Sequence, residues 1–211
     1  MFAIVESGSI TSMPGGNKGV EINGVKHSAD VFTGKWTESE RNAIGVYTIE
    51  IDNTNKKDSA WYTNTDITYA FGSGKVTGSY GTATAKPIAD IKWTQKEIDD
   101  GKAPDGADTD TVAVEGLKTK LIRTIKSQAE GELNKTDWYV TRKTEESTAI
   151  PSAVTTHRKA VRSKQASMET SITNASDTPA LETLYTVVNT ADEGDTPVYE
   201  RPLGKIPVKE F

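Results

Sequence analysis

The sequence predicts an α+β protein. We expect a β-rich amino-terminal domain of hairpins, as a small sandwich or barrel, then a small helical-hairpin domain and an extended carboxyl-terminal arm. In the first ninety residues, short valine, isoleucine and aromatic runs alternate with glycine-rich turns, as in β-hairpins. After residue 111, apolar residues recur at steps of three and four, as in amphipathic helices. After residue 191, three prolines at five-residue intervals exclude a helix.

Composition limits the function classes. The chain has 211 residues, enough for one domain or two small ones, and only 35% are hydrophobic. So low an apolar content predicts small cores, long polar segments, or burial completed by another subunit. The absence of cysteine excludes disulfides, thiolate catalysis and cysteine-based zinc sites. The net charge of −5 excludes a generally basic nucleic-acid binder.

The charge is unevenly distributed. Residues 1–111 carry 11 basic and 16 acidic residues, residues 112–172 carry 11 and 7, and residues 173–211 carry 3 and 7. The alternating sign predicts three structural units, although chance differences between solvated faces explain it as well.

The β-rich domain is predicted over residues 1–93. It begins with a short strand, "MFAIVES", followed by glycine-punctuated hairpins. Thr37 and Glu40 have the spacing of a capping box, which predicts a short helix ending at Gly45. The alternating segment "VYTIEID" predicts a half-buried strand.

The clearest hairpin lies in "ITYAFGSGKVTGSY". Ile67, Tyr69 and Phe71 share one face of the first strand, and "GSGK" supplies the turn. Val76 and Tyr80 share a face of the return strand, so aromatic and β-branched side chains pair across the two strands.

Residues 94–111 are predicted to be a linker between domains, since they hold five aspartates and almost no large apolar side chains. A helical domain of about three helices is predicted over residues 112–190. The first helix presents Val114, Leu117, Leu121 and Ile125.

The next two helices follow from the same periodicity. The second begins at Pro151 and has an apolar stripe and a basic face. The stripe consists of Val154, Val161, Met168 and Ile172, and the polar face of Arg158, Lys159, Arg162 and Lys164. Asp177 or Thr178 caps the third helix, which directs Leu181, Leu184 and Val188 inward. Between the first two helices we expect a structural corner of Asp137, Trp138 and Pro151, in which Trp138 fills the interface.

Residues 191–211 are predicted to form a proline-punctuated extended arm. Its apolar content is high for a disordered tail, so an arm that lies on another surface is favoured. A flexible tail, or one that folds back on its own domain, is the alternative. The candidate partner-binding residues are Val198, Tyr199, Leu203, Ile206, Val208 and Phe211.

No arrangement of residues predicts catalysis. His27 and His157 lack metal-ligand spacing, and the aspartates of 99–110 do not match the twelve-residue calcium loop, whose terminal glutamate is missing. The segment "GSGK" lacks the spacing of a phosphate-binding loop. We therefore expect no enzyme activity, no cofactor and no metal site.

A nucleic-acid site is an alternative, because Trp138 and Tyr139 stand near a basic helix and aromatic rings can stack on bases. Packing of Trp138 between two helices is favoured over it.

The segment "LNKTDWYVTRKTEESTAIPSAVTTHRKAVR" resembles tail-fibre assembly proteins and related virion proteins of tailed bacteriophages. In that family a "TDW" element ends a helix, a proline follows, and the next helix carries a "YR.A.R"-type stretch. The matching residues are Thr136, Asp137, Trp138, Pro151, Arg158, Ala160 and Arg162. His157 stands where the family usually has tyrosine, and the tryptophan that often precedes that tyrosine is missing.

The resemblance implies a structural component of a phage tail, at the baseplate, adaptor or fibres, that acts through protein–protein assembly. A tail-fibre assembly chaperone that is not retained in the particle is the alternative. Its partners would be other tail proteins and copies of itself, and its location the virion tail after synthesis in the bacterial cytoplasm. No window approaches 18 apolar residues and the amino terminus lacks a basic signal-peptide region, so neither membrane insertion nor secretion is expected.

Overall fold

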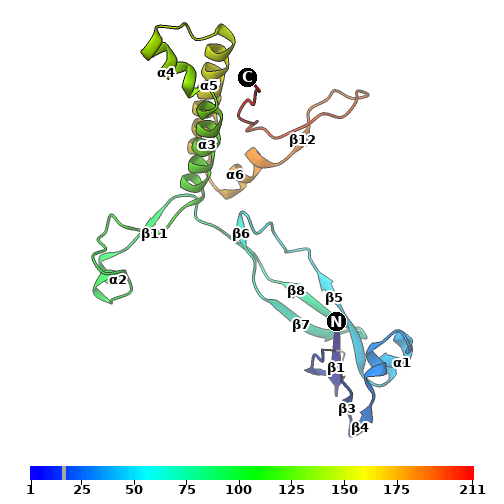
Figure 1. Ribbon diagram of the computed structural model, residues 1–211. Coiled ribbons are helices and arrows are strands. Elements are labelled where there is room, and N and C mark those ends of the chain that lie inside the picture. The colour runs from blue at the N-terminus through cyan, green and yellow to red at the C-terminus, as the bar shows by residue number, and fades with distance from the viewer. Residues whose placement is uncertain (16–17) are drawn as a thin grey trace. The chain divides into compact units, whose positions relative to one another are not determined.

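The computed structural model describes residues 1–15 and 18–211. The chain divides into two compact units, residues 1–84 and 85–211 (Figure 1). About 35% of the residues are helical and 22% lie in strands, with a β-rich amino-terminal region, which confirms the predicted α+β class.

The first unit is a five-stranded sheet with short additions. Its elements are β1 (Phe2–Glu6), β2 (Ser9–Ser12), β3 (Val20–Ile22), β4 (Val25–His27), the 3-10 helix η1 (Ala29–Phe32), α1 (Glu38–Ala43), β5 (Val46–Asp52), β6 (Tyr62–Thr63), β7 (Ile67–Gly72) and β8 (Lys75–Tyr80). The strand order is β2-β1-β5-β8-β7, and β5 and β8 pair in parallel. Because β2 also approaches β7, the sheet is nearly closed like a barrel.

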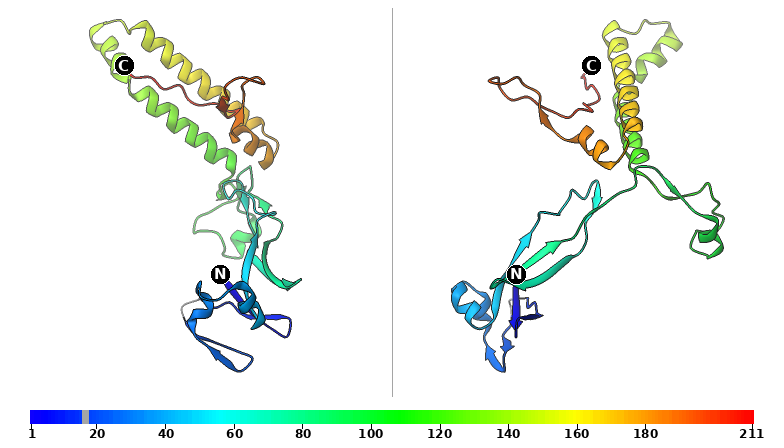
Figure 2. Two further views of the ribbon diagram at one scale, coloured as in Figure 1. Left: turned by 90° about the vertical axis from the view of Figure 1, so that its right-hand side faces the viewer. Right: turned by 180° about the vertical axis from the view of Figure 1, so that it is seen from behind.

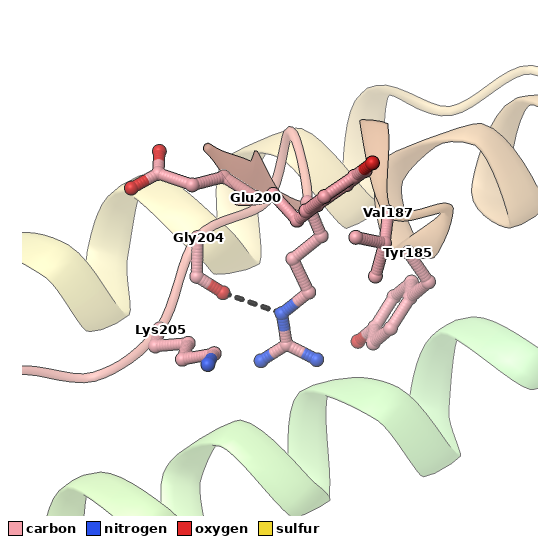
Figure 3. Close-up of a pocket in the computed structure, with 7 residues that line it drawn as sticks. Tyr185, Val187, Glu200, Gly204 and Lys205 are labelled. Atoms are coloured by element: carbon pink, nitrogen blue, oxygen red, sulfur yellow. Dashed lines mark hydrogen bonds between the residues drawn. The ribbon is translucent and has the colours of Figure 1, made fainter. Parts of the chain in front are cut away.

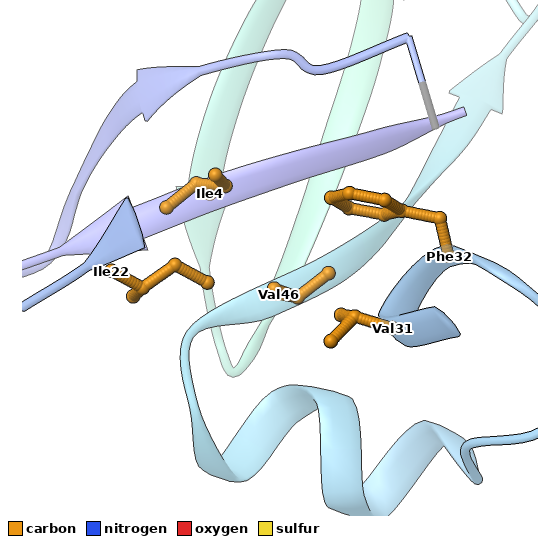
Figure 4. Close-up of a cluster of buried hydrophobic side chains, with 5 residues drawn as sticks. All are labelled: Ile4, Ile22, Val31, Phe32 and Val46. Carbon is orange, nitrogen blue, oxygen red and sulfur yellow. The ribbon is translucent and has the colours of Figure 1, made fainter. Parts of the chain in front are cut away.

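Both faces of β1 are buried. Ile4 packs on one face of the sheet with residues of β3, η1 and β5 (Figure 4). Ala3 and Val5 point to the other face and pack with Ile49 and Val76. A strand covered on both faces needs consecutive apolar residues, as "FAIV" provides.

Local signals in this unit specify their elements directly. The Thr37 side chain accepts from the Glu40 backbone N–H, and the Glu40 carboxylate accepts from the Thr37 N–H, so the predicted capping box forms. Gly45 follows α1 with φ +87°, and a Cβ there would lie 2.5 Å from the Val5 carbonyl oxygen. The β7–β8 hairpin has the predicted pairs, with Phe71 opposite Val76.

The second unit is built around two long helices. Its elements are β10 (Ile91–Lys92), α2 (Gln95–Asp99), β11 (Val112–Val114), α3 (Leu117–Asn134), α4 (Asp137–Glu146), α5 (Ser152–Asn174), α6 (Thr178–Tyr185), β12 (Val188–Asn189) and β13 (Tyr199–Glu200), with β9 (Thr84–Ala85) at the boundary of the units. Helices α3 and α5 lie side by side and antiparallel (Figure 2). Among residues 1–15 and 18–211, no helix combines the length and apolar character needed to cross a bilayer.

The segment predicted as a linker has structure of its own. The compact units divide between Thr84 and Ala85, ahead of residues 94–111. Strands β10 and β11 pair at the base of that segment, and Thr94 and Glu97 form a second capping box that starts α2. Val114 lies in β11 and is exposed, so it does not belong to the apolar face of α3, which begins after Gly116.

The predicted stripe of α5 is confirmed. All four of its apolar residues are buried, as are Ile125 and Ala129 of α3. Asp177 caps α6 by accepting from the Ala180 N–H, and Leu181 is fully buried. Val188, predicted to face inward, is instead exposed in β12.

Candidate protein-interaction surfaces

Arg158 holds the corner between α3, α4 and α5. Its Nη1 donates to the Leu133 carbonyl oxygen at 2.7 Å and to the Thr136 hydroxyl at 2.8 Å, and lies 2.7 Å from Asp137 Oδ1. Thr136 is fully buried and Arg158 is 8% exposed. The prediction that Arg158 belongs to the solvent face of α5 is therefore wrong, because its guanidinium is buried in contact with Leu133, Thr136 and Asp137.

The prediction that Trp138 fills this corner is also wrong. Trp138 is 51% exposed. It follows Asp137, the first residue of α4, and its ring lies on Tyr139 with centroids 3.8 Å apart and on the Arg142 guanidinium at 4.7 Å. Asp137 does belong to the corner, whereas Pro151 is the N-cap of α5 and precedes its first turn.

Substitution of Trp138 by alanine is expected to change the free energy of unfolding of the helical unit by less than about 0.5 kcal/mol, the usual range for a surface site. Chemical denaturation followed by far-ultraviolet circular dichroism measures it. A loss of about 3 kcal/mol or more, typical of a buried tryptophan, would show that the ring is packed in the corner after all.

A groove lies between α4 and α5. Its volume is about 430 Å³. The lining residues are Val140, Ile150, Thr155, Arg158, Lys159, Arg162 and Ser163. Lys159 and Arg162 are exposed, and no acidic residue is among those lining the groove. The charge of Arg158 is paired with Asp137. The positive charge of the groove therefore comes from Lys159 and Arg162. We call it the α4–α5 groove.

The carboxyl-terminal arm folds back on its own unit. The Leu203 N–H donates to the Leu184 carbonyl oxygen at 2.9 Å, and Leu203 and Ile206 are 2% and 7% exposed. These two residues are therefore not available to a partner, which corrects their assignment as partner-binding. The alternative of an arm folded on its own domain is what the structure shows for this segment.

A cavity of about 400 Å³ lies where the arm leaves α6 (Figure 3). Arg201 Nε donates to the Gly204 carbonyl oxygen at 2.6 Å, and its guanidinium lies 5.3 Å from the centre of the Tyr185 ring. Burial raises the pKa of Tyr185 above its ordinary value of 10. These contacts tie the arm to the end of α6.

The end of the arm covers a buried polar cluster. The Glu132 carboxylate accepts from Lys135 Nζ at 2.6 Å, and its other oxygen lies 3.6 Å from His157 Nε2, beyond hydrogen-bond distance. The Phe211 ring lies edge-on to His157 at 5.2 Å. Lys135 holds the pKa of Glu132 below its ordinary value. His157 is buried.

This cluster makes the free energy of unfolding of the helical unit depend on pH in the acidic range. Because folding lowers the pKa of Glu132, its contribution is present above the ordinary glutamate value of 4.5 and is lost as pH falls through the folded pKa. Thermal unfolding measured between about pH 6 and pH 3 should therefore depend less steeply on pH in Glu132→Gln than in the wild type. Glu130→Gln, on the exposed side of α3, is the matched control. Equal slopes for Glu132→Gln and wild type would contradict the assignment.

Strands β12 and β13 form an exposed hairpin, which we call the β12–β13 hairpin (residues 187–200). Val188 pairs with Glu200, and Asn189 with Tyr199. Its large apolar side chains are exposed: Val187 60%, Val188 42%, Val198 49% and Tyr199 68%. The segment holds four acidic residues and no basic one. Of the other predicted partner-binding residues, Val208 and Phe211 are also exposed, at 71% and 50%.

Within the described part of the chain, no group of three or more acidic, histidine or cysteine residues is placed to hold a metal ion. In the segment of residues 94–111, Asp110 pairs with Lys92 at 2.7 Å and Asp100 with Lys96 at 2.9 Å. Both the α4–α5 groove and the β12–β13 hairpin place exposed apolar side chains beside charge of one sign.

Neither a protein-family model, nor a curated protein, nor a solved structure matches the chain.

Proposed function

We propose that this chain is a structural component of a bacteriophage tail and acts through protein–protein assembly. The observation that carries the proposal is the group of exposed apolar side chains on the β12–β13 hairpin. Exposed apolar side chains grouped beside polar residues are typical of protein-binding sites. The resemblance of residues 133–162 to phage tail proteins supplies the type of assembly.

The second candidate is a tail-fibre assembly chaperone that leaves before the particle is complete. It is favoured by the corner of Thr136, Asp137 and Arg158, which brings together residues that carry the resemblance to fibre-assembly proteins. The two candidates differ in whether the mature particle retains the chain.

Disruption of the gene tests both candidates against an unrelated role. An early stop codon in the phage genome should leave heads intact and yield particles with incomplete tails or missing fibres in negative-stain electron microscopy. Supplying the wild-type chain from a plasmid should restore them. Morphologically complete and infectious particles from the stop-codon phage would overturn both candidates.

A further inference from the structure

We propose that the β12–β13 hairpin of one copy of this chain binds the α4–α5 groove of a second copy. The inference rests on the proposed assembly function and names one of its partners. It is carried by the charge and apolar character of two surfaces within the same unit.

The hairpin supplies an acidic and apolar ligand. Asp192, Glu193 and Asp195 lie in the turn that joins β12 to β13, closed by a hydrogen bond from the Asp195 N–H to the Asp192 carbonyl oxygen at 3.1 Å. Val198 and Tyr199 follow on the return strand and are exposed. Each strand is two residues long, and an isolated two-stranded hairpin is marginally stable in water. A second surface that covers the hairpin would stabilise it.

The groove supplies the complementary site. Lys159 and Arg162 stand one turn apart on α5, so both can face acidic side chains of a segment lying across the helix. Val140 and Ile150 line the same groove and offer contact area to an apolar side chain of the hairpin. On α4 itself, Arg142 and Lys143 are balanced by Glu145 and Glu146, so the excess positive charge comes from α5.

A chain cannot fill its own groove in this arrangement. Helix α4 and the hairpin lie on opposite sides of the α3–α5 pair, as two views show (Figures 1 and 2). The contact is therefore between copies and joins two different surfaces. Such heterologous contacts repeat from copy to copy and build a ring where the rotation closes or a filament where it does not.

Charge reversal tests the pairing. The groove variant carries Lys159→Glu and Arg162→Glu, and the hairpin variant carries Asp192→Lys and Glu193→Lys. The full-length chain is examined by multi-angle light scattering at low ionic strength, over a range of concentrations. We expect the wild type to self-associate, and each variant alone to associate about tenfold or more weakly, because like charges now face each other.

The mixture of the two variants is the decisive sample. In an equimolar mixture every groove again meets a hairpin of opposite charge, so association should return to near the wild-type level. The matched control is Lys18→Glu with Lys26→Glu, an equal change of charge at exposed residues of the first unit, which should leave association unchanged. Circular dichroism of each variant shows whether it is folded.

Three results would overturn the inference. They are a wild type that stays monomeric at every concentration, variants that associate as the wild type does, and a folded mixture that fails to recover. A labelled single-stranded oligonucleotide that binds the wild type but not the groove variant, with no self-association, would assign the groove to nucleic acid instead. Each of these results leaves the stop-codon phenotype unaffected, so failure of the inference is distinct from failure of the proposed function.

Discussion

Replacement of Arg158 by alanine is expected to lower the free energy of unfolding of the helical unit by about 2–4 kcal/mol. The substitution removes one of the donors to the Leu133 carbonyl oxygen, the donor to the buried Thr136 hydroxyl, and the partner of Asp137. Hydrogen bonds from a charged group contribute more than neutral ones, and the Thr136 hydroxyl, which is fully buried, loses the donor that it accepts from. Urea denaturation followed by circular dichroism at 222 nm measures the loss.

Arg162→Ala is the matched control for Arg158→Ala. It removes the same side chain one turn later on α5, from an exposed position, and should stay within about 0.5 kcal/mol of the wild type. Arg158→Lys should recover only part of the loss, since an ammonium group is more strongly hydrated than a guanidinium and costs more to bury. If Arg158→Ala is as mild as Arg162→Ala, the corner does not depend on this guanidinium.

Replacement of Leu203 by alanine is expected to cost about 2–5 kcal/mol, the range for a leucine removed from a packed interior. Leu203 is 2% exposed and is fixed by the hydrogen bond between its own N–H and the Leu184 carbonyl oxygen. The arm is thus part of the core of its unit, and deletion of residues 196–211 should destabilise that unit. Differential scanning calorimetry of the full chain reports this effect on the transition of the helical unit.

Val208→Ala is the comparison for Leu203→Ala, because Val208 belongs to the same arm and is 71% exposed. It should shift unfolding by less than about 0.5 kcal/mol. A truncated chain as stable as the wild type would show that the arm is not part of the folded unit, and would return it to the role of a free clasp.

The elements that could be predicted from sequence are those specified by neighbours along the chain. The capping box that begins α1 is formed entirely by Thr37 and Glu40, three residues apart. In the same way, the Ser73–Gly74 turn sets the register of β7 and β8. The same threonine–glutamate spacing stands at Thr94 and Glu97, but the surrounding aspartates favoured a linker. A capping signal in a polar segment therefore merits the same weight as one beside an apolar run.

The features that could not be predicted depend on residues far apart in sequence. The parallel pairing of β5 with β8 has no local pattern. Trp138 was expected inside because it joins two helices, but Thr136 and Arg158 satisfy the corner and leave the tryptophan outside. The prolines of the arm predict an extended path, and apolar residues on such a path are equally satisfied by their own domain or by a partner.

The two candidate binding surfaces also differ in how far a local pattern predicts them. The basic face of α5 was visible from its period, whereas the β12–β13 hairpin was missed even though "VV" and "VY" flank an acidic turn with a glycine. Gly194 takes φ +94° in that turn, a conformation that glycine adopts readily. Gly194 favours a turn between two strands, whereas Pro197 disfavours a strand directly after it.

The most direct test of the central claim is the composition of purified phage particles. Quantitative mass spectrometry, with a known major tail protein as internal standard, should find this chain at a fixed number of copies per tail that survives high-salt washing. Complete absence from infectious particles would contradict a structural role in the virion and leave the assembly chaperone as the remaining candidate.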